Sequence, residues 1–397
     1  MSYGFRALAN PLAEGGAGDG GAGAGGAPGS DEVLAFHRRL PGYEPTPLVS
    51  LPRLASSLGV AELLVKVESV RLGLPSFKML GASWATYRAL SERLGAGSDG
   101  ARDWADVEEL AERCTPLLPL RLAAATDGNH GRAVARMARW LGFGARIFVP
   151  AGTSAARIEG IEREGAEVVV VDGGYDEAVA RSAREEGPDC LVISDTSWPG
   201  YVDVPRWVID GYRTMFAEID DALAAARRPG PQVVVVPVGV GALAAAAVAR
   251  FAHGPSAASL IGVEPTSAAC VTASALAGKP VTLSGPQDSI MVGLNCGTPS
   301  PVAWPRVSRG LAGFVTIDDD WAREAVRLLA ASGIEAGETG AAAVGGLLAL
   351  RRQGRASPLG PLVGTGTRVL VLVTEGASDP PAWRAILGTE LVGGAVR

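Results

Sequence analysis

The lysine at position 78 is the residue of this chain best suited to covalent chemistry with a carbonyl compound. Only Lys66, Lys78 and Lys279 are lysines among the 36 basic residues, and an arginine cannot form a Schiff base. Lys78 lies in the segment PSFKMLGA, in the first turn of a helix that we expect from Phe77 to about Leu94. The helix dipole and desolvation by apolar neighbours would both disfavour its ammonium form. The alternatives are an arginine-biased composition and an ordinary surface lysine at a helix start.

A short polar segment later in the chain, residues 125–131, has the sequence ATDGNHG. Its polar residues Asp127, Asn129 and His130 are flanked by glycines and run into an expected helix. Polar side chains and open backbone amides at a helix start form an anion-binding arrangement. The alternative is a capped turn, in which Asp127 or Asn129 serves only the helix N-terminus. A further acid, Asp195, follows an expected strand, where open α/β sheets bind ligands, although it could also be a turn-forming residue.

The glycine-rich segment at residues 237–247 has the sequence PVGVGALAAAA and is expected to form a strand, a turn and a helix. Its backbone amides could therefore surround a phosphate. It also fits the dinucleotide fingerprint G-x-G-x-x-A through Gly239, Gly241 and Ala244, with Glu264 ending the next strand. An NAD-binding protein is thus an alternative of a different class. A single match of this kind explains neither the lysine nor the polar segment, and purely structural glycines are a third alternative.

Strands and helices alternate along much of the chain. Because parallel strands need long connections, this alternation predicts parallel sheets with helical crossovers. We expect an α/β protein with two open parallel-sheet domains: a large domain of residues 31–88 and 205–397, and a small domain of residues 89–204. Residues 1–30 contain a Gly/Ala tract and are expected to be disordered. The expected strands are 63–68, 145–150, 167–171, 190–194, 233–237, 260–264 and 368–374, and the expected helices include 31–39, 155–164 and 175–186.

The composition favours an enzyme that acts on small molecules. A net charge of -6 and a pI near 5.3 argue against a nucleic-acid partner. The longest apolar stretch, residues 233–249, is interrupted by proline and glycine, so we interpret it as a buried strand and helix and expect no membrane partner. The N-terminus lacks a signal-peptide pattern, which predicts a cytoplasmic protein. With four cysteines, three histidines and no CxxC, we expect free thiols and no metal site, while a Cys270–Cys296 pair stays open.

Several segments in one order resemble the fold-type II pyridoxal-phosphate enzymes and, more narrowly, the diaminopropionate ammonia-lyases. The resemblance extends from about Phe36 to Asp379, and the ordered set is specific where any one segment would not be. It implies a homodimer that converts 2,3-diaminopropionate, as the D-isomer, the L-isomer or both, to pyruvate and ammonia, with pyridoxal 5'-phosphate in the cleft between the domains. The segments are FHRRLPGYEPTPLVSLP, SFKMLGA, ATDGNHGRAVA, DTSWPGY, SIMVGLNCGTPS, GETGAAAVGGL and VTEGASD.

The resemblance also implies roles for individual residues. Lys78 should carry the cofactor as a Schiff base with Phe77 beside the ring, while Asn129 should bind its phenolic oxygen. Asp127 and Asp195 look like two acids that serve opposite faces of the substrate, Asp127 for the D-isomer and Asp195 for the L-isomer. The remaining implied contacts are Thr374 with the pyridine nitrogen, Gly239, Val240, Gly241, Ala242 and Leu243 with the phosphate, and Thr126 and Ser289 with the substrate.

The sequence departs from the family pattern at Val292, at Val373 and at the pair Ala377–Ser378. Such changes affect the leaving group rather than the cofactor, because a cofactor site persists while specificity drifts. A serine/threonine dehydratase or a β-replacement enzyme of the same fold is therefore the alternative within this class, and the two aspartates favour the lyase. A non-catalytic binding module is the remaining alternative.

Overall fold

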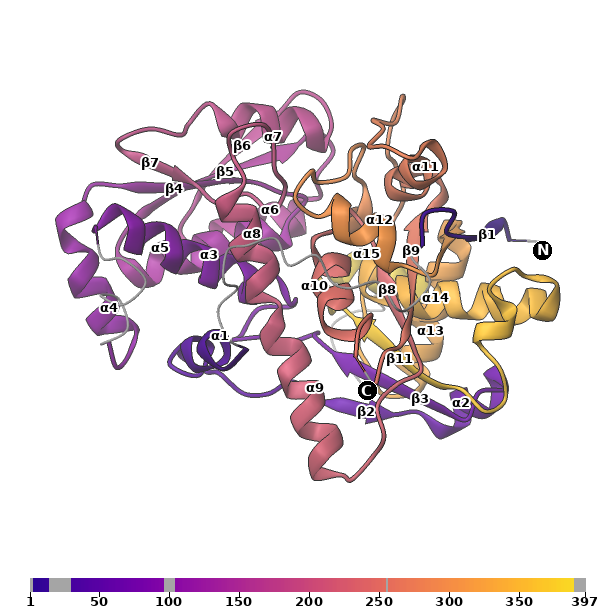
Figure 1. Cartoon of the computed structure of the whole chain (residues 1–397). Helices are drawn as coiled ribbons and strands as arrows, with labels where there is room; N and C mark the ends of the chain where they lie inside the picture. Colours follow the sequence, from indigo (N-terminus) through magenta and orange to yellow (C-terminus); the bar gives the residue numbers. More distant parts are fainter. Residues whose placement is uncertain (1–2, 14–29, 96–103, 255, 389–397) are drawn as a thin grey trace.

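The computed structural model describes residues 3–13, 30–95, 104–254 and 256–388 of the 397-residue chain. Within them the strands form two sheets in separate parts of the molecule, with helices packed against both (Figure 1). All strands of the smaller sheet lie between residues 121 and 192, and the strands of the larger sheet come from before and after this stretch. The chain therefore passes from the larger half into the smaller half and back.

The larger sheet is mostly parallel. It consists of β1 (Phe5–Ala9), β2 (Leu48–Ser50), β3 (Glu62–Val67), β8 (Val233–Pro237), β9 (Ser259–Pro265), β10 (Gly313–Ile317) and β11 (Arg368–Val373). The strand order is β1-β10-β9-β8-β11-β3-β2, and only the edge strands β1 and β2 pair in antiparallel fashion. The central strands are rich in Val and Leu and are buried on both faces, as a parallel sheet covered by helices requires. The carboxyl ends of these parallel strands consequently meet at one edge.

The smaller sheet is parallel throughout the described residues. It consists of β4 (Arg121–Ala125), β5 (Gly144–Pro150), β6 (Glu167–Val171) and β7 (Cys190–Val192). The strand order is β6-β5-β4-β7. Ligands bind beyond the carboxyl ends of such strands, and the predicted residues Asp127 and Asp195 follow β4 and β7 at these ends.

Helices connect the strands and cover the sheets (Figure 1). Those of the first half are α1 (Ser30–His37), α2 (Pro52–Leu58), α3 (Lys78–Arg93), α4 (Val107–Cys114), α5 (Asn129–Leu141), α6 (Ala155–Glu162) and α7 (Tyr175–Ala183). Those of the second half are α8 (Asp203–Gly211), α9 (Arg213–Ala225), α10 (Ala242–Phe251), α11 (Cys270–Ala277), α12 (Trp304–Gly310), α13 (Asp319–Ala331), α14 (Glu338–Gln353) and α15 (Pro380–Leu387).

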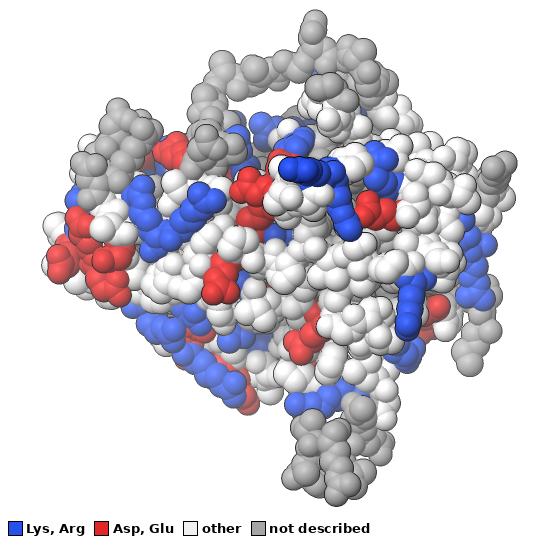
Figure 2. Space-filling view, turned by 90° about the horizontal axis from the view of Figure 1, so that it is seen from below, with Lys and Arg blue, Asp and Glu red and all other residues white. Residues whose placement is uncertain are grey.

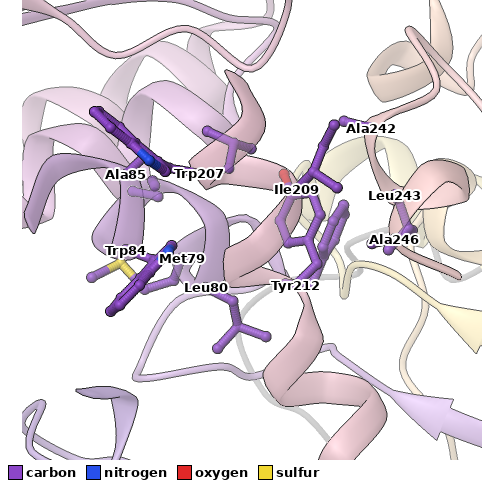
Figure 3. Packing of buried hydrophobic residues seen from close by; sticks show 14 of the residues in the cluster. Met79, Leu80, Trp84, Ala85, Trp207, Ile209, Tyr212, Ala242, Leu243 and Ala246 are labelled. Atoms are coloured by element: carbon purple, nitrogen blue, oxygen red, sulfur yellow. The ribbon is translucent and has the colours of Figure 1, made fainter. Parts of the chain in front are cut away.

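Helices α3 and α8 pack very closely beside α10. Apolar side chains of the three helices form one buried cluster, seen in Figure 3. A Cβ atom added to Gly211 would lie 2.4 Å from the carbonyl oxygen of Leu80, and one added to Gly81 would lie 2.6 Å from the ring of Tyr212. These two glycines allow the backbones to approach, and this fixes the position of the helix that begins with Lys78.

The prediction that residues 1–30 are disordered is wrong for part of that range. Residues 5–9 form β1, which pairs with β10 from Phe5 opposite Ile317 to Ala9 opposite Gly313. The Phe5 ring also packs edge-on against Trp321 at a centroid distance of 5.8 Å, so an apolar contact stabilises the strand. Residues 14–29, which hold most of the Gly/Ala tract, lie outside the described residues. The boundaries of the two predicted domains stay a prediction.

The described part of the chain shows no helix that is long and apolar enough to cross a membrane. It also holds no cluster of three His, Cys, Asp or Glu side chains arranged to bind a metal ion. All four cysteines are free, including Cys270 and Cys296. Positive and negative side chains are interspersed over the face shown in Figure 2.

Candidate active site

A cavity lies between the two halves of the molecule. The predicted residues Lys78, Asp127 and Asp195 all line it, although they are far apart in the sequence. The remaining lining residues are Phe77, Asn129, Tyr175, Tyr212, Pro237, Gly239, Val240, Gly241, Ala242, Leu243, Val292, Gly293, Leu294, Asn295, Cys296, Thr339, Thr374 and Glu375. Both sheets contribute through the loops at the carboxyl ends of their strands, as expected for an open α/β protein.

Lys78 begins α3, and its ammonium group contacts a carboxylate. The Nζ atom donates a hydrogen bond to Oδ2 of Asp195 and lies 5.6 Å from the centroid of the Phe77 ring. Burial acts to lower the pKa of Lys78, but the attraction to Asp195, followed by that to Tyr212, outweighs burial, so the pKa is raised. The prediction of a destabilised ammonium form is therefore wrong for this state of the protein. The sequence did not reveal that a carboxylate 117 positions away would face this lysine.

Asp195 is held between two donors. Its Oδ2 atom accepts from Lys78, and its Oδ1 atom accepts from the hydroxyl of Tyr175 at 2.8 Å. Burial acts to raise the pKa of Asp195, but the charge of Lys78 and these hydrogen bonds outweigh it, so the pKa is lowered. Burial, together with the charge of Asp195, raises the pKa of Tyr175 well above its usual value. Asp195 is thus an ionised carboxylate whose orientation is fixed on both oxygens.

Asp127 has weaker partners than Asp195. Its Oδ1 atom accepts from the Thr126 hydroxyl at 3.5 Å, and its Oδ2 atom has no hydrogen-bond partner among the described residues. The NH1 atom of Arg157 lies 3.9 Å from Oδ2. The following residue, Gly128, has φ +147°, a backbone conformation that favours glycine. The carboxylate at position 127 therefore retains acceptor capacity toward the cavity.

Asn129 belongs to a polar network at the end of β11. Its Nδ2 atom donates to Oε2 of Glu375, and its Oδ1 atom accepts from the Ser378 hydroxyl at 3.1 Å. The neighbouring hydroxyl of Thr374 is buried and has no partner among the described residues. Buried polar groups are normally satisfied, so the unpaired Thr374 hydroxyl in the cavity wall indicates a missing ligand atom.

The loop after β8 leads into the N-terminus of α10. Gly241 is the N-cap of this helix and has φ +98°, which only glycine adopts readily. A Cβ atom on Gly239 would lie 3.2 Å from both Cys296 Sγ and the carbonyl oxygen of Gly293, so the loop also requires a small residue there. Backbone N–H groups at a helix N-terminus bind anions such as phosphate.

Glu264, the acid required by the dinucleotide fingerprint, has a different role. Its carboxylate accepts from the backbone N–H groups of Val271 and Thr272, each at 2.8 Å, and from the Thr272 hydroxyl. It is completely buried, and burial raises its pKa to about 7. Glu264 therefore caps α11 and is not available to a ribose.

Comparison with known proteins agrees with the geometry of the site. The model of the family "Pyridoxal-phosphate dependent enzyme" matches residues 39–375. A diaminopropionate ammonia-lyase of Salmonella typhimurium is 34% identical over 375 residues, which cover 90% of this chain and 91% of that protein. The chain belongs to the diaminopropionate ammonia-lyase family of pyridoxal-phosphate-dependent enzymes.

Solved structures of this family share the fold. The Escherichia coli diaminopropionate ammonia-lyase in complex with D-serine superposes with a TM-score of 0.87 and 31% identity, covering 97% of each chain. The same enzyme with an aminoacrylate-pyridoxal-phosphate azomethine reaction intermediate superposes with a TM-score of 0.86. The fold-type II α/β architecture, the lyase class and the pyridoxal phosphate cofactor predicted from the sequence are confirmed.

The residues around the cavity fit the cofactor of a diaminopropionate ammonia-lyase. A lysine amine, an unpaired buried hydroxyl at Thr374 and a glycine loop at a helix N-terminus all face one space. These groups are chemically suited to an aldehyde, a pyridine nitrogen and a phosphate, respectively. The donor set therefore suits pyridoxal phosphate better than it suits a dinucleotide.

Two predicted substrate contacts lie outside the cavity wall. The Ser289 hydroxyl donates to Asp319 Oδ1 at 2.6 Å, and the Thr126 hydroxyl accepts from the backbone N–H of Gly128 at 2.8 Å. Neither residue lines the cavity, and each shapes a loop that does. Their contact with substrate stays a prediction.

Sequence analysis missed several residues that the structure brings to the site. Tyr175 starts α7 and Tyr212 follows α8, and neither position carries a distinctive local pattern. Glu375 lies within the segment VTEGASD but was not singled out, although a buried acid two residues after the end of an apolar strand is a recognisable signal. Arg157 is one of many arginines, so only its burial distinguishes it.

Proposed function

We propose that this chain catalyses the β-elimination of 2,3-diaminopropionate, giving pyruvate and two equivalents of ammonia with consumption of one water. The observation that carries the proposal is a lysine that shares one cavity with two separate carboxylates, Asp127 and Asp195. Similarity to enzymes named for this reaction over nine tenths of the chain supports it. Two carboxylates exceed what a single proton abstraction at one face of the substrate requires.

We propose that the aldehyde, phosphate, pyridine nitrogen and phenolic oxygen of the cofactor are each bound by a group already described. Lys78 would bind pyridoxal phosphate covalently, the loop Gly239–Leu243 would bind its phosphate, and Thr374 would meet its pyridine nitrogen. The Asn129 amide has a second N–H beyond the one donated to Glu375, which would serve the phenolic oxygen, and Phe77 would lie beside the ring. When bound, the cofactor supplies an electron sink for the electron pair released at the substrate α-carbon.

The two acids are proposed to act on opposite faces of the substrate. They come from different loops: Asp127 follows β4 and Asp195 follows β7. A base positioned on one side can remove only the proton that points to that side. We assign Asp127 to the α-proton of the D-isomer and Asp195 to that of the L-isomer, with loss of the β-amino group as ammonia following proton removal.

A panel of D- and L-amino acids tests this function directly. Holoenzyme is incubated with each isomer of 2,3-diaminopropionate, serine and threonine, and release of pyruvate (2-oxobutanoate for threonine) and ammonia is measured. We expect the highest kcat/KM on 2,3-diaminopropionate. Higher kcat/KM on serine or threonine would identify a dehydratase instead, and tight NAD binding without a lysine-bound chromophore would overturn the enzyme class.

A homodimer and a cytoplasmic location complete the proposal. Size-exclusion chromatography with light scattering measures the mass directly, and a mass near twice the 40.5 kDa of one chain is expected. Fractionation of cells producing the full chain measures the location.

A further inference from the structure

Arg157 is a buried cation just outside the cavity. It lies in α6, its side chain is only 4% exposed, and it is absent from the cavity wall. A buried guanidinium requires partners, because an isolated charge is strongly disfavoured in the interior. The identity of these partners therefore indicates what the residue does.

The first partner of Arg157 is the acid Asp127. The NH1 atom donates to the carbonyl oxygen of Asp127 at 3.4 Å and lies 3.9 Å from its Oδ2 atom. One guanidinium nitrogen thus contacts both the backbone and the side chain of the same residue. A Cβ atom on Gly128 would lie 3.3 Å from NH1, so the glycine leaves room for this approach.

The second partner, Glu375, belongs to the other half of the molecule. The NH2 atom of Arg157 lies 3.8 Å from Oε1 of Glu375, and Oε2 of the same carboxylate accepts from Asn129. Burial acts to lower the pKa of Arg157, but Glu375 and then Asp127 outweigh it and hold the pKa above its usual value. The cation therefore connects the loop of Asp127 to the strand end that carries Thr374.

We propose that Arg157 is a positioning residue that holds the Asp127 carboxylate in its reactive orientation and thereby selectively sets the activity on one enantiomer. Asp195 has its own donors, Lys78 and Tyr175, and is not a partner of Arg157. The inference rests on the proposed function, since it assigns Asp127 to the D-isomer. Arg157 would thus be a residue outside the cavity that positions Asp127 but not Asp195.

Kinetics of Arg157→Gln on both isomers test the inference. Glutamine retains a donor but removes the charge, so we expect kcat on D-2,3-diaminopropionate to fall about 10–100-fold with little change in KM, because a misplaced group costs roughly 10²-fold. The kcat on the L-isomer should stay within about threefold of the wild-type value, a smaller change than the loss of a positioned base causes. Arg157→Lys should recover part of the loss. Equal losses on both isomers would overturn the inference.

A double-variant cycle separates positioning from a general structural effect. If Arg157 acts through Asp127, Arg157→Gln should cause no further loss on the D-isomer in an Asp127→Asn background, whereas multiplying losses would overturn the inference. The matched control is Arg136→Gln, which removes an Arg–Glu164 pair with an Nε–Oε2 distance of 2.5 Å in the same half of the molecule. It should leave the D/L ratio unchanged.

Activity of the wild-type enzyme separates a failure of the proposed function from a failure of the role of Arg157. If the wild type releases no pyruvate from either isomer, the proposed function itself is wrong. Selective loss in Asp127→Asn without selective loss in Arg157→Gln would remove only the role of Arg157. A wild type active on the L-isomer alone would overturn both the two-acid assignment and the role of Arg157, while leaving β-elimination intact.

Discussion

Two lysines of this chain lie in opposite kinds of buried environment. Lys66 in β3 donates to the carbonyl oxygen of Thr46 at 2.7 Å and to Glu218 at 2.6 Å. Arg71 adds bonds from its guanidinium to Glu68 and Glu218, and the charged side chains of this cluster are at most 2% exposed. We call Lys66, Glu68, Arg71 and Glu218 the internal charge cluster. Its two cations and two anions balance, and every charged group has a partner.

The cavity around Lys78 is incompletely paired by comparison. Buried polar atoms of Asp127, Tyr212, Thr374 and Glu375 line it without a hydrogen-bond partner among the described residues. An unpaired buried polar atom costs stability unless a ligand satisfies it. The difference shows that burial of a lysine alone does not indicate a functional site. Unpaired polar atoms around a cavity do indicate one, because a bound ligand can satisfy them.

Backbone hydrogen bonds connect the internal charge cluster to the cavity. The segment after β3 carries Glu68 and Arg71 and then pairs Ser76 with Glu375 in an isolated bridge. The backbone N–H of Phe77 donates to the carbonyl oxygen of Thr374 at 3.3 Å. The internal charge cluster thus anchors the segment that ends at Lys78.

The largest expected effect comes from replacing the lysine of the cavity. Lys78→Ala should abolish turnover and the visible absorbance of the lysine-bound cofactor while leaving the fold intact, because it removes the covalent attachment. Lys279→Ala removes an exposed lysine and is the matched control. Steady-state pyruvate release and circular dichroism measure both. Wild-type turnover in Lys78→Ala or Lys78→Arg would show that Lys78 does not bind the cofactor covalently.

The acids of the cavity should separate by stereochemistry. Asp127→Asn should lose mainly D-activity and Asp195→Asn mainly L-activity, each by about 10²–10⁴-fold, since this is the usual contribution of a positioned base. Kinetics of both variants on both isomers measure the effect, with Asp189→Asn, an exposed acid of the same half, as the control. If each variant loses the two activities equally, the acids act on binding or cofactor geometry and the two-base assignment fails.

The internal charge cluster should respond in stability rather than in chemistry. Lys66→Met leaves the two buried carboxylates Glu68 and Glu218 with one cation, Arg71, instead of two, and breaking a buried pair costs about 3–5 kcal/mol. Chemical denaturation of the holoenzyme measures this loss, and kcat of the folded fraction should stay near the wild-type value. Arg163→Met, which removes an exposed pair with Glu159, should cost about 1 kcal/mol or less. A large loss of kcat at unchanged stability would show that Lys66 takes part in catalysis. The contrast between Lys66 and Lys78 would then fail.

The smallest of these effects concerns cofactor affinity. Gly241→Val introduces a β-branched residue at φ +98°, a backbone conformation that L side chains rarely adopt, and should displace the N-terminus of α10. We expect the Kd for pyridoxal phosphate to rise by about tenfold or more, equivalent to about 1.4 kcal/mol, in a fluorescence titration. Gly366→Ala, at an exposed glycine with open space around it, is the control. An unchanged affinity would locate the phosphate elsewhere.

The sequence by itself determined the elements that carry the chemistry. Periodicity and turn residues located β5, β6, β8 and β11 to within a residue at each end, and placed Lys78 at the start of a helix. These are local properties, because hydrophobic alternation and glycine turns depend on neighbouring residues. The ordered motifs additionally identified the family, which no single segment could have done.

Tertiary structure decided how those elements meet and which charges face one another. The strand order brings β11 between β8 and β3, so the residues after three distant strands converge on Lys78. The raised pKa of this lysine, the pairing of Asp195 with Tyr175 and the contact between Arg157 and Asp127 all join residues at least 20 positions apart. Such contacts depend on packing between elements, which local sequence patterns do not specify.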